Sequence, residues 1–260
     1  MSNDKQSHLR RELIMGSVTG SDHSNMLLAE IVTKNIRSAI VFEEFGLDFC
    51  CRGNRTLKDA CADKNIDVQK VVNELAKLSD NNNGTHDMND WQLDILVDYI
   101  INNHHQYVRR MIPITSLHAD KVASVHGKNH PETLQIADLF LAVREELEGH
   151  MMKEERILFP QIKQMVQTQK ENSQFFPPPF GTIQNPIRMM EYEHTSAGDA
   201  LYQVRELSGN YTHPEDACNT FKALYSELKE FEEDLHKHIH LENNILFPKS
   251  VELESALLGN

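Results

Sequence analysis

Two segments of the chain repeat the same set of groups that could do chemistry. They read HMMKEERILFP at residues 150–160 and HIHLENNILFP at residues 238–248, and both fit the pattern H-x-x-x-E-x-x-I-L-F-P. On a helix, residues i and i+4 share one face, with Cβ atoms roughly 5–6 Å apart. Each segment could therefore offer an imidazole nitrogen and a carboxylate oxygen to the same metal ion.

The two segments belong to long stretches in which apolar residues recur at alternating spacings of three and four. Such stretches cover residues 97–112, 136–157, 187–204 and 221–245. This spacing places the apolar side chains on one helix face, which packs inward in a helical protein. Four amphipathic helices of this kind predict an all-α fold built around a four-helix bundle.

Histidine and glutamate occupy positions in these stretches where the pattern expects leucine. An unpaired buried carboxylate costs several kcal/mol or becomes protonated, so a compensating partner is needed. A pair of divalent or trivalent cations would supply it. The inward residues are His105 in the first stretch (His104 also lies in its apolar arc), His150 and Glu154 in the second, His194 in the third, and His238 and Glu242 in the fourth.

This ligand set favours iron. If both carboxylates bridge two ions, each ion receives about four protein donors, an oxo or hydroxo bridge adds another, and about one position stays open. Mixed imidazole and carboxylate ligands suit non-haem iron, whereas manganese usually takes more carboxylate. The absence of thiolate ligands argues against a structural zinc site.

Other ionisable residues have weaker assignments. Glu146, one turn before His150, and Glu193, next to His194, could orient the ligands by hydrogen bonds, or simply lie on solvated helix faces. The remaining histidines that leave the inward register are expected at the surface or beside the ligands: His118, His126, His130, His213, His236 and His240.

The chain divides into two parts. Residues 22–80 alternate short apolar and polar runs around the turn DFCCRG, which predicts a small helical domain containing Cys50 and Cys51. Residues 79–88, SDNNNGTHDM, have the composition of a linker. The bundle is expected over residues 89–255.

Composition excludes several classes of protein. The net charge of the 260 residues is −13, and no basic stripe is present to bind nucleic acid or an anionic membrane. No apolar run approaches the ~20 residues of a membrane span, and the polar N-terminus lacks a secretion signal. A cytoplasmic protein is therefore expected.

The C-terminal part resembles hemerythrin-like di-iron proteins, and the whole chain resembles the iron–sulfur cluster repair proteins of the RIC or YtfE/ScdA family. The matching segments are GLDFCCRGNRTLKDAC, HMMKEERILFP, MMEYEHTSAGDAL and HLENNILFP. The resemblance implies two non-haem iron ions joined by an oxo or hydroxo bridge. It also selects His105 over His104 on the first helix. The implied ligands are His105, His150, Glu154, His194, His238 and Glu242.

The same resemblance implies repair of iron–sulfur clusters damaged by nitrosative or oxidative stress, by donation of iron to the damaged proteins. Cys50 and Cys51 match the family's cysteine pair, although Arg52 stands where the family has glycine. They are candidates for a redox or iron-handoff role, with ordinary core packing as the alternative. Two further functions use the same ligands: nitric oxide reduction, and binding of O2 or NO as a hemerythrin-like sensor. A homodimer through the N-terminal domain is compatible with the sequence.

Overall fold

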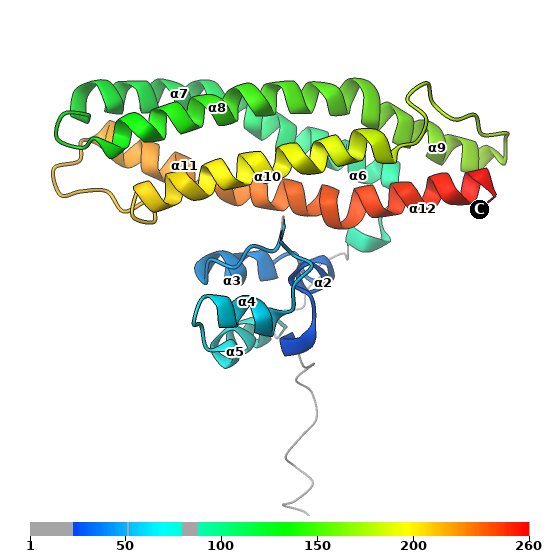
Figure 1. Cartoon of the computed structure of the whole chain (residues 1–260), viewed down its shortest axis with the longest axis horizontal. Coiled ribbons are helices and arrows are strands. Elements are labelled where there is room, and N and C mark those ends of the chain that lie inside the picture. Colours follow the sequence, from blue (N-terminus) through cyan, green and yellow to red (C-terminus); the bar gives the residue numbers. More distant parts are fainter. Residues whose placement is uncertain (1–22, 51, 80–87, 260) are drawn as a thin grey trace, which may run out of the picture.

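The computed structural model describes residues 23–50, 52–79 and 88–259, and the regular elements in these ranges are all helices, joined by loops. A small N-terminal unit precedes a long bundle (Figure 1). The elements of the N-terminal unit are η1 (His23–Asn25), α2 (Leu28–Lys34), α3 (Ser38–Glu44), α4 (Leu57–Asp63) and α5 (Val68–Ser79).

Local sequence signals explain where these short helices begin and end. Thr56 precedes α4, and its hydroxyl accepts a hydrogen bond from the Asp59 amide at 3.1 Å, which satisfies a free N–H at the helix start. Gly46 follows the end of α3 with φ +63°, a conformation that glycine adopts without steric cost. The chain can therefore turn back toward Leu47 and the segment that carries Cys50.

The bundle consists of four helical rods, three of which are interrupted by a π-helical turn. The first rod joins α6 (Leu93–Ile100), η3 (Ile101–His105) and α7 (Gln106–His126). The second joins α8 (Glu132–Lys153), η4 (Glu154–Leu158) and α9 (Phe159–Glu171). The third is α10 (Gln184–Leu207), and the fourth joins α11 (Asn219–Leu241), η5 (Glu242–Leu246) and α12 (Phe247–Leu258). A short 3-10 turn, η2 (Met88–Asp90), precedes the first rod.

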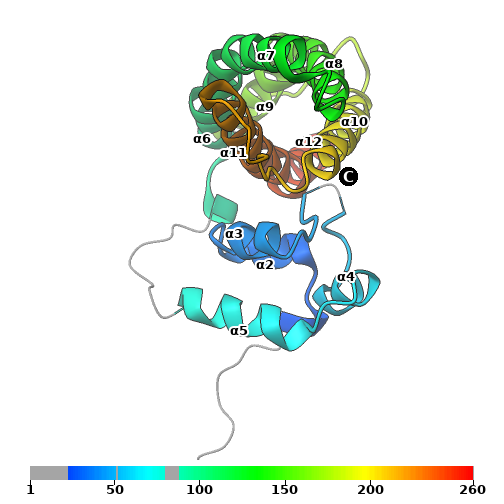
Figure 2. The same ribbon diagram turned by 90° about the vertical axis from the view of Figure 1, so that its left-hand side faces the viewer.

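The rods form a closed ring when viewed along the bundle (Figure 2). Helix α8 packs between α7 and α10, and α11 completes the ring by contacting both α7 and α10. The N-terminal unit lies beside the fourth rod, where α2 contacts η5. The predicted all-α fold, a four-helix bundle preceded by a small helical domain, is confirmed.

A layer of polar side chains crosses the bundle between two apolar clusters. One cluster contains Phe140, Phe231 and the apolar core of the N-terminal unit. The other contains Ile100, Phe159 and Phe247, near the opposite end of the bundle. The rods supply the expected inward histidines and glutamates between these clusters. Within the described ranges, none of the helices is long and apolar enough to span a membrane.

Candidate metal centre

Three of the four rods widen into a π turn where they carry the predicted ligands. His105 ends η3, whereas Glu154 and Glu242 begin η4 and η5. The Phe159 N–H donates to the Glu154 carbonyl, and the Phe247 N–H donates to the Glu242 carbonyl, each across five residues. π turns inside α-helices often mark functional sites.

A proline follows the widened turn in each of the two repeated segments, whereas η3 widens without one. Pro160 and Pro248 follow directly after Phe159 and Phe247. A proline has no N–H to donate, and its ring collides with the carbonyl four residues earlier in a regular α-helix. The wider turn relieves this conflict while the helix continues. The shared I-L-F-P ending thus shapes the backbone at each glutamate.

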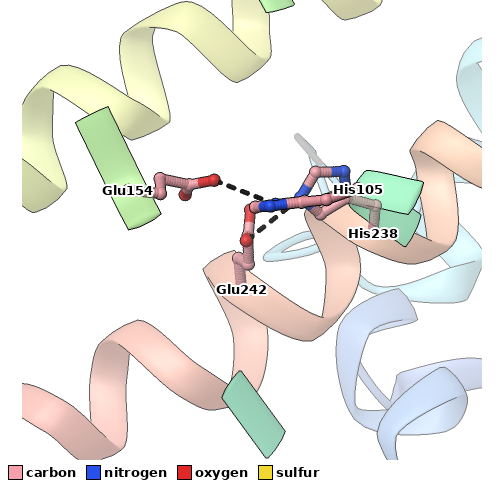
Figure 3. Close-up of side chains that lie close together, drawn as sticks. All are labelled: His105, Glu154, His238 and Glu242. Carbon is pink, nitrogen blue, oxygen red and sulfur yellow. Dashed lines mark ion pairs between the residues drawn. The ribbon is translucent and has the colours of Figure 1, made fainter. Parts of the chain in front are cut away.

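The six predicted ligands converge in the middle of the bundle. Their ligand atoms form two groups in which all atoms lie within 4.8 Å of one another, and both groups contain Glu154 and Glu242. The first group adds His105 and His238, as Figure 3 shows, and the second adds His150 and His194. We call these groups the 105/238 position and the 150/194 position.

The distances within these groups are short and similar. Glu154 Oε2 lies 3.3 Å from Nε2 of both His105 and His150. Glu242 places Oε1 3.0 Å from His238 Nε2 and Oε2 3.0 Å from His194 Nε2. Each carboxylate therefore faces one histidine of each position.

Burial makes this arrangement costly without a cation. Glu154 and Glu242 are 0% exposed, and none of their four carboxylate oxygens has a hydrogen-bond donor among the described residues. Nε2 of His150 and Nε2 of His194 lie only 3.0 Å apart, although at most one of them can donate to the other. Buried polar atoms are nearly always satisfied in native proteins. The donor set therefore fits metal ions bound between the two carboxylates.

The electrostatic environment keeps both carboxylates ionised. Burial and the Glu242 charge raise the pKa of Glu154, but the neighbouring histidines lower it below its ordinary value. Burial also opposes ionisation of Glu242, yet His238 and His194 hold its pKa well below the ordinary value. Two carboxylates that stay charged in one buried space provide strong, hard oxygen ligands.

The histidines respond to the same charges in different ways. Burial lowers the pKa of His150, but nearby carboxylates, Glu154 first, raise it to about 10. The pKa of His105 is also raised, because Glu154 outweighs the effect of burial. For His238, burial dominates and the pKa is lowered despite Glu242. Protons and metal ions therefore compete for this donor set, since a ligating imidazole must be neutral.

Hydrogen bonds from outside the centre orient three of the four histidines. In each bond the ring nitrogen Nδ1 is paired, which leaves Nε2 directed at the carboxylates. The pairs are His105 with Glu155 at 2.7 Å, His150 with Glu193 at 3.0 Å, and His194 with Asn243 at 2.8 Å. The two acidic partners are themselves paired with cations, Glu155 with Arg109 and Glu193 with Lys153.

Glu193 and Glu146, both predicted to orient ligands, have different environments. The hydrogen bond from His150, the largest cause, lowers the pKa of Glu193 to about 2. Glu146 is half-buried and makes no hydrogen bond or ion pair with a ligand in the part of the chain that the structure describes. Helical periodicity did not identify Glu155 and Asn243 as partners of the ligands. Their position directly after the repeated glutamates was the available signal.

His104 lies beside the centre but takes no part in either group. It is 5% exposed, its Nδ1 is 3.0 Å from Asp234 Oδ1, and its ring stacks on His238 with centroids 5.7 Å apart. Of the two adjacent histidines, His105 is the one that the structure brings to the carboxylates. This is the position that the family resemblance implied.

The N-terminal unit contacts the fourth rod next to the centre. His240 is 0% exposed, with Nε2 3.5 Å from the Thr33 hydroxyl, and the Asn244 side chain donates to the Cys50 carbonyl at 3.4 Å. His240 is therefore buried between the N-terminal unit and the bundle. The sequence pattern had suggested a residue at the surface or beside the ligands. Cys50 is buried, and its thiol donates to Asp48 Oδ1 at 3.4 Å. Cys51 lies outside the described residues.

Comparison with known families and proteins agrees with both parts of the chain. The model of the hemerythrin HHE cation binding domain matches residues 96–250, and a domain of unknown function, ScdA_N (DUF542), matches residues 24–79. The iron–sulfur cluster repair protein YtfE of Yersinia pestis (strain Pestoides F) is 37% identical over 233 residues, which cover 88% of this chain and 98% of the relative. YtfE of Yersinia pseudotuberculosis (serotype O:1b, strain IP 31758) matches to the same extent. The chain therefore belongs to the YtfE family of iron–sulfur cluster repair proteins, and its bundle is a hemerythrin HHE domain.

Proposed function

We propose that this protein repairs iron–sulfur clusters damaged by nitrosative or oxidative stress, and that it does so by donating iron. The observation that carries the proposal is the pair of overlapping His/Glu groups that share Glu154 and Glu242. Two iron ions would fit this donor set, held by the four histidines and by Glu154 and Glu242, and an oxo or hydroxo bridge would complete the oxidised, ferric pair. The relatives named for cluster repair support the same function.

The chemistry of the ligands favours donation over permanent storage. Imidazole and carboxylate hold ferrous iron less firmly than thiolate and sulfide do, because the softer sulfur donors suit cluster iron. The bound ions supply the iron that a damaged cluster has lost. Transfer to a cysteine-rich acceptor is then favourable, and the acceptors are cytoplasmic proteins with damaged clusters.

The contact between the N-terminal unit and the fourth rod supports a role for Cys50 in iron handoff. Asn244, which donates to the Cys50 carbonyl, lies two residues after Glu242 in the same π turn. Cys50 also lines a cavity of about 380 Å³ between the N-terminal unit and helices α10 and α11. We therefore assign Cys50 and Cys51 to the handoff of iron or to its redox control.

The experiment is repair of a cluster enzyme that nitric oxide has inactivated. Iron-loaded protein should restore its activity, whereas Glu154→Leu and Glu242→Leu should lose both bound iron and repair. Glu191→Leu is the matched control, because Glu191 is exposed and lies on the same helix as His194. Normal repair by the Glu154 and Glu242 variants would contradict the proposal. Rapid multiple-turnover formation of nitrous oxide would instead favour nitric oxide reduction.

A further inference from the structure

The two metal positions are related by an approximate twofold symmetry that the repeated segments create. The phenylalanine of each segment stacks on a ligand histidine of a different rod. Phe159 lies 5.6 Å from His105 between ring centroids, with planes 19° apart, and Phe247 lies 5.9 Å from His194, with planes 3° apart. The apolar walls of the two positions therefore match.

The hydrogen bonds that follow the repeated glutamates obey the same symmetry. Glu155 comes directly after Glu154 and accepts from His105, and Asn243 comes directly after Glu242 and accepts from His194. The twofold symmetry therefore includes the hydrogen bonds that orient His105 and His194. A ligand contact that breaks this symmetry can therefore be traced to one particular residue.

The departure occurs at His238. His150 has the acceptor Glu193, the residue that directly precedes His194. By symmetry, the corresponding acceptor for His238 would be the residue that directly precedes His105, which is His104. Nδ1 of His238 has no hydrogen-bond partner among the described residues.

His104 occupies the acceptor's place without acting as one. Its ring lies almost parallel to that of His238, with planes 12° apart, so it offers a π face in place of an oxygen lone pair. Its own Nδ1 is engaged by Asp234 at 3.0 Å, which fixes the ring in this orientation. His238 is therefore held by stacking where the other three ligand histidines are held by hydrogen bonds.

We propose that the two metal positions are unequal, that the 105/238 position releases its ion first, and that His104 sets this order. The inference rests on the proposed di-iron function and names which ion is donated. An acceptor on the outer nitrogen orients a ligand histidine and raises its basicity, and loss of such a partner typically weakens metal binding 10–100-fold. His104 is a positioning residue, since it acts on the metal position only through His238.

The test measures iron release from the loaded, full-length protein. The protein is reduced without oxygen and mixed with excess ferrous chelator, and the coloured chelate is followed with time. Two phases of equal amplitude are expected, with rates roughly 10–100-fold apart. His104→Gln should slow the fast phase toward the slow one. Its amide oxygen can accept from His238, while its amide nitrogen can still donate to Asp234.

A second variant acts on the other position. Asn243→Ala removes the acceptor of His194 and should speed the slow phase, so that the two phases approach one another. Glu191→Gln, the control, changes an exposed residue and should leave both phases unchanged. Far-UV circular dichroism and the initial iron content of each variant show that it is folded and loaded before release begins.

The outcomes separate this inference from the proposed function. Release of both ions in one phase by the wild-type protein would overturn the inference, as would a fast phase that His104→Gln leaves unchanged or a slow phase that Asn243→Ala leaves unchanged. Each of these results would leave the di-iron function in place. Failure of the wild-type protein to bind about two irons per chain would overturn the proposed function, and the inference with it.

Discussion

Iron binding should stabilise this protein strongly, because it satisfies four buried carboxylate oxygens that lack hydrogen-bond donors within the described structure. A ligand that binds only the folded state at 100 times its Kd contributes about 2.7 kcal/mol. Two ions, each present at about 100 times its own Kd, would contribute about 5 kcal/mol, which corresponds to a rise in Tm of roughly 10–20 °C for a chain of this size. Thermal melts followed by far-UV circular dichroism, with and without ferrous iron under anaerobic conditions, measure this rise.

Glu242→Gln should abolish most of the rise. Glu242 faces one histidine of each metal position, so the neutral amide weakens both positions at once. The quantity compared is the difference between loaded and metal-free melts of each variant, which cancels any effect of the substitution on the metal-free protein. Glu191→Gln, at an exposed site, should keep the full rise. The reasoning would be refuted if Glu242→Gln kept the wild-type rise as well.

Three further predictions concern a π turn, a buried ion pair in the bundle and the domain contact. Pro248→Ala restores an N–H and removes the ring behind the η5 turn, so metal affinity should fall roughly tenfold in titrations while helicity is kept; unchanged affinity would show that the proline does not shape the site. Arg205→Leu removes the cation 2.8 Å from Glu232, which is 3% exposed and then keeps the Tyr211 hydroxyl as a donor. Denaturant unfolding should show a loss of about 3–5 kcal/mol, much of which the double variant with Glu232→Leu should recover. Burial lowers the pKa of His240 to about 4 from 6.5. The contribution of neutral His240 to the free energy of unfolding is therefore complete above the unfolded-state pKa and is lost as pH falls toward the folded-state pKa. The loss should be about 2 kcal/mol between pH 7 and pH 5. In metal-free protein, His240→Gln should flatten this part of the pH dependence, and equal slopes would contradict the assignment.

The sequence predicted the bundle and the six inward residues because both depend on helical periodicity. His150 with Glu154, and His238 with Glu242, share a helix face in any helix of this length, so local spacing was sufficient. The choice between His104 and His105 was different, since adjacent residues on one helix both fell within the apolar arc. There the family resemblance pointed to His105, which the structure places at the carboxylates.

Contacts between rods could not be predicted in the same way. Glu155 accepts from His105 on another rod, and His240 is buried by residues of the N-terminal unit. Such contacts depend on how the rods are rotated and how the domains dock, and periodicity within one helix carries no information about either. The π turns were also missed, because periodicity assumes a regular α-helix. Proline at the same place in both repeated segments was a signal for two of them, η4 and η5, but no such signal in the sequence marks η3.

The symmetry of the ligands and the asymmetry of their neighbours suit a donor of iron. Each repeated segment supplies one histidine and one shared carboxylate, and the first and third rods supply the second histidine of each position, so the two ions would meet the same kinds of donor. The residues next to the ligands differ, with Glu193 on one side and His104 on the other. If both positions were equally weak, the two ions would leave together and the buried carboxylates would lose all compensation. With one stronger position, the first ion can leave while the second still holds Glu154 and Glu242 together. A centre with one weaker and one stronger metal position can release an iron ion while the bundle around it stays folded.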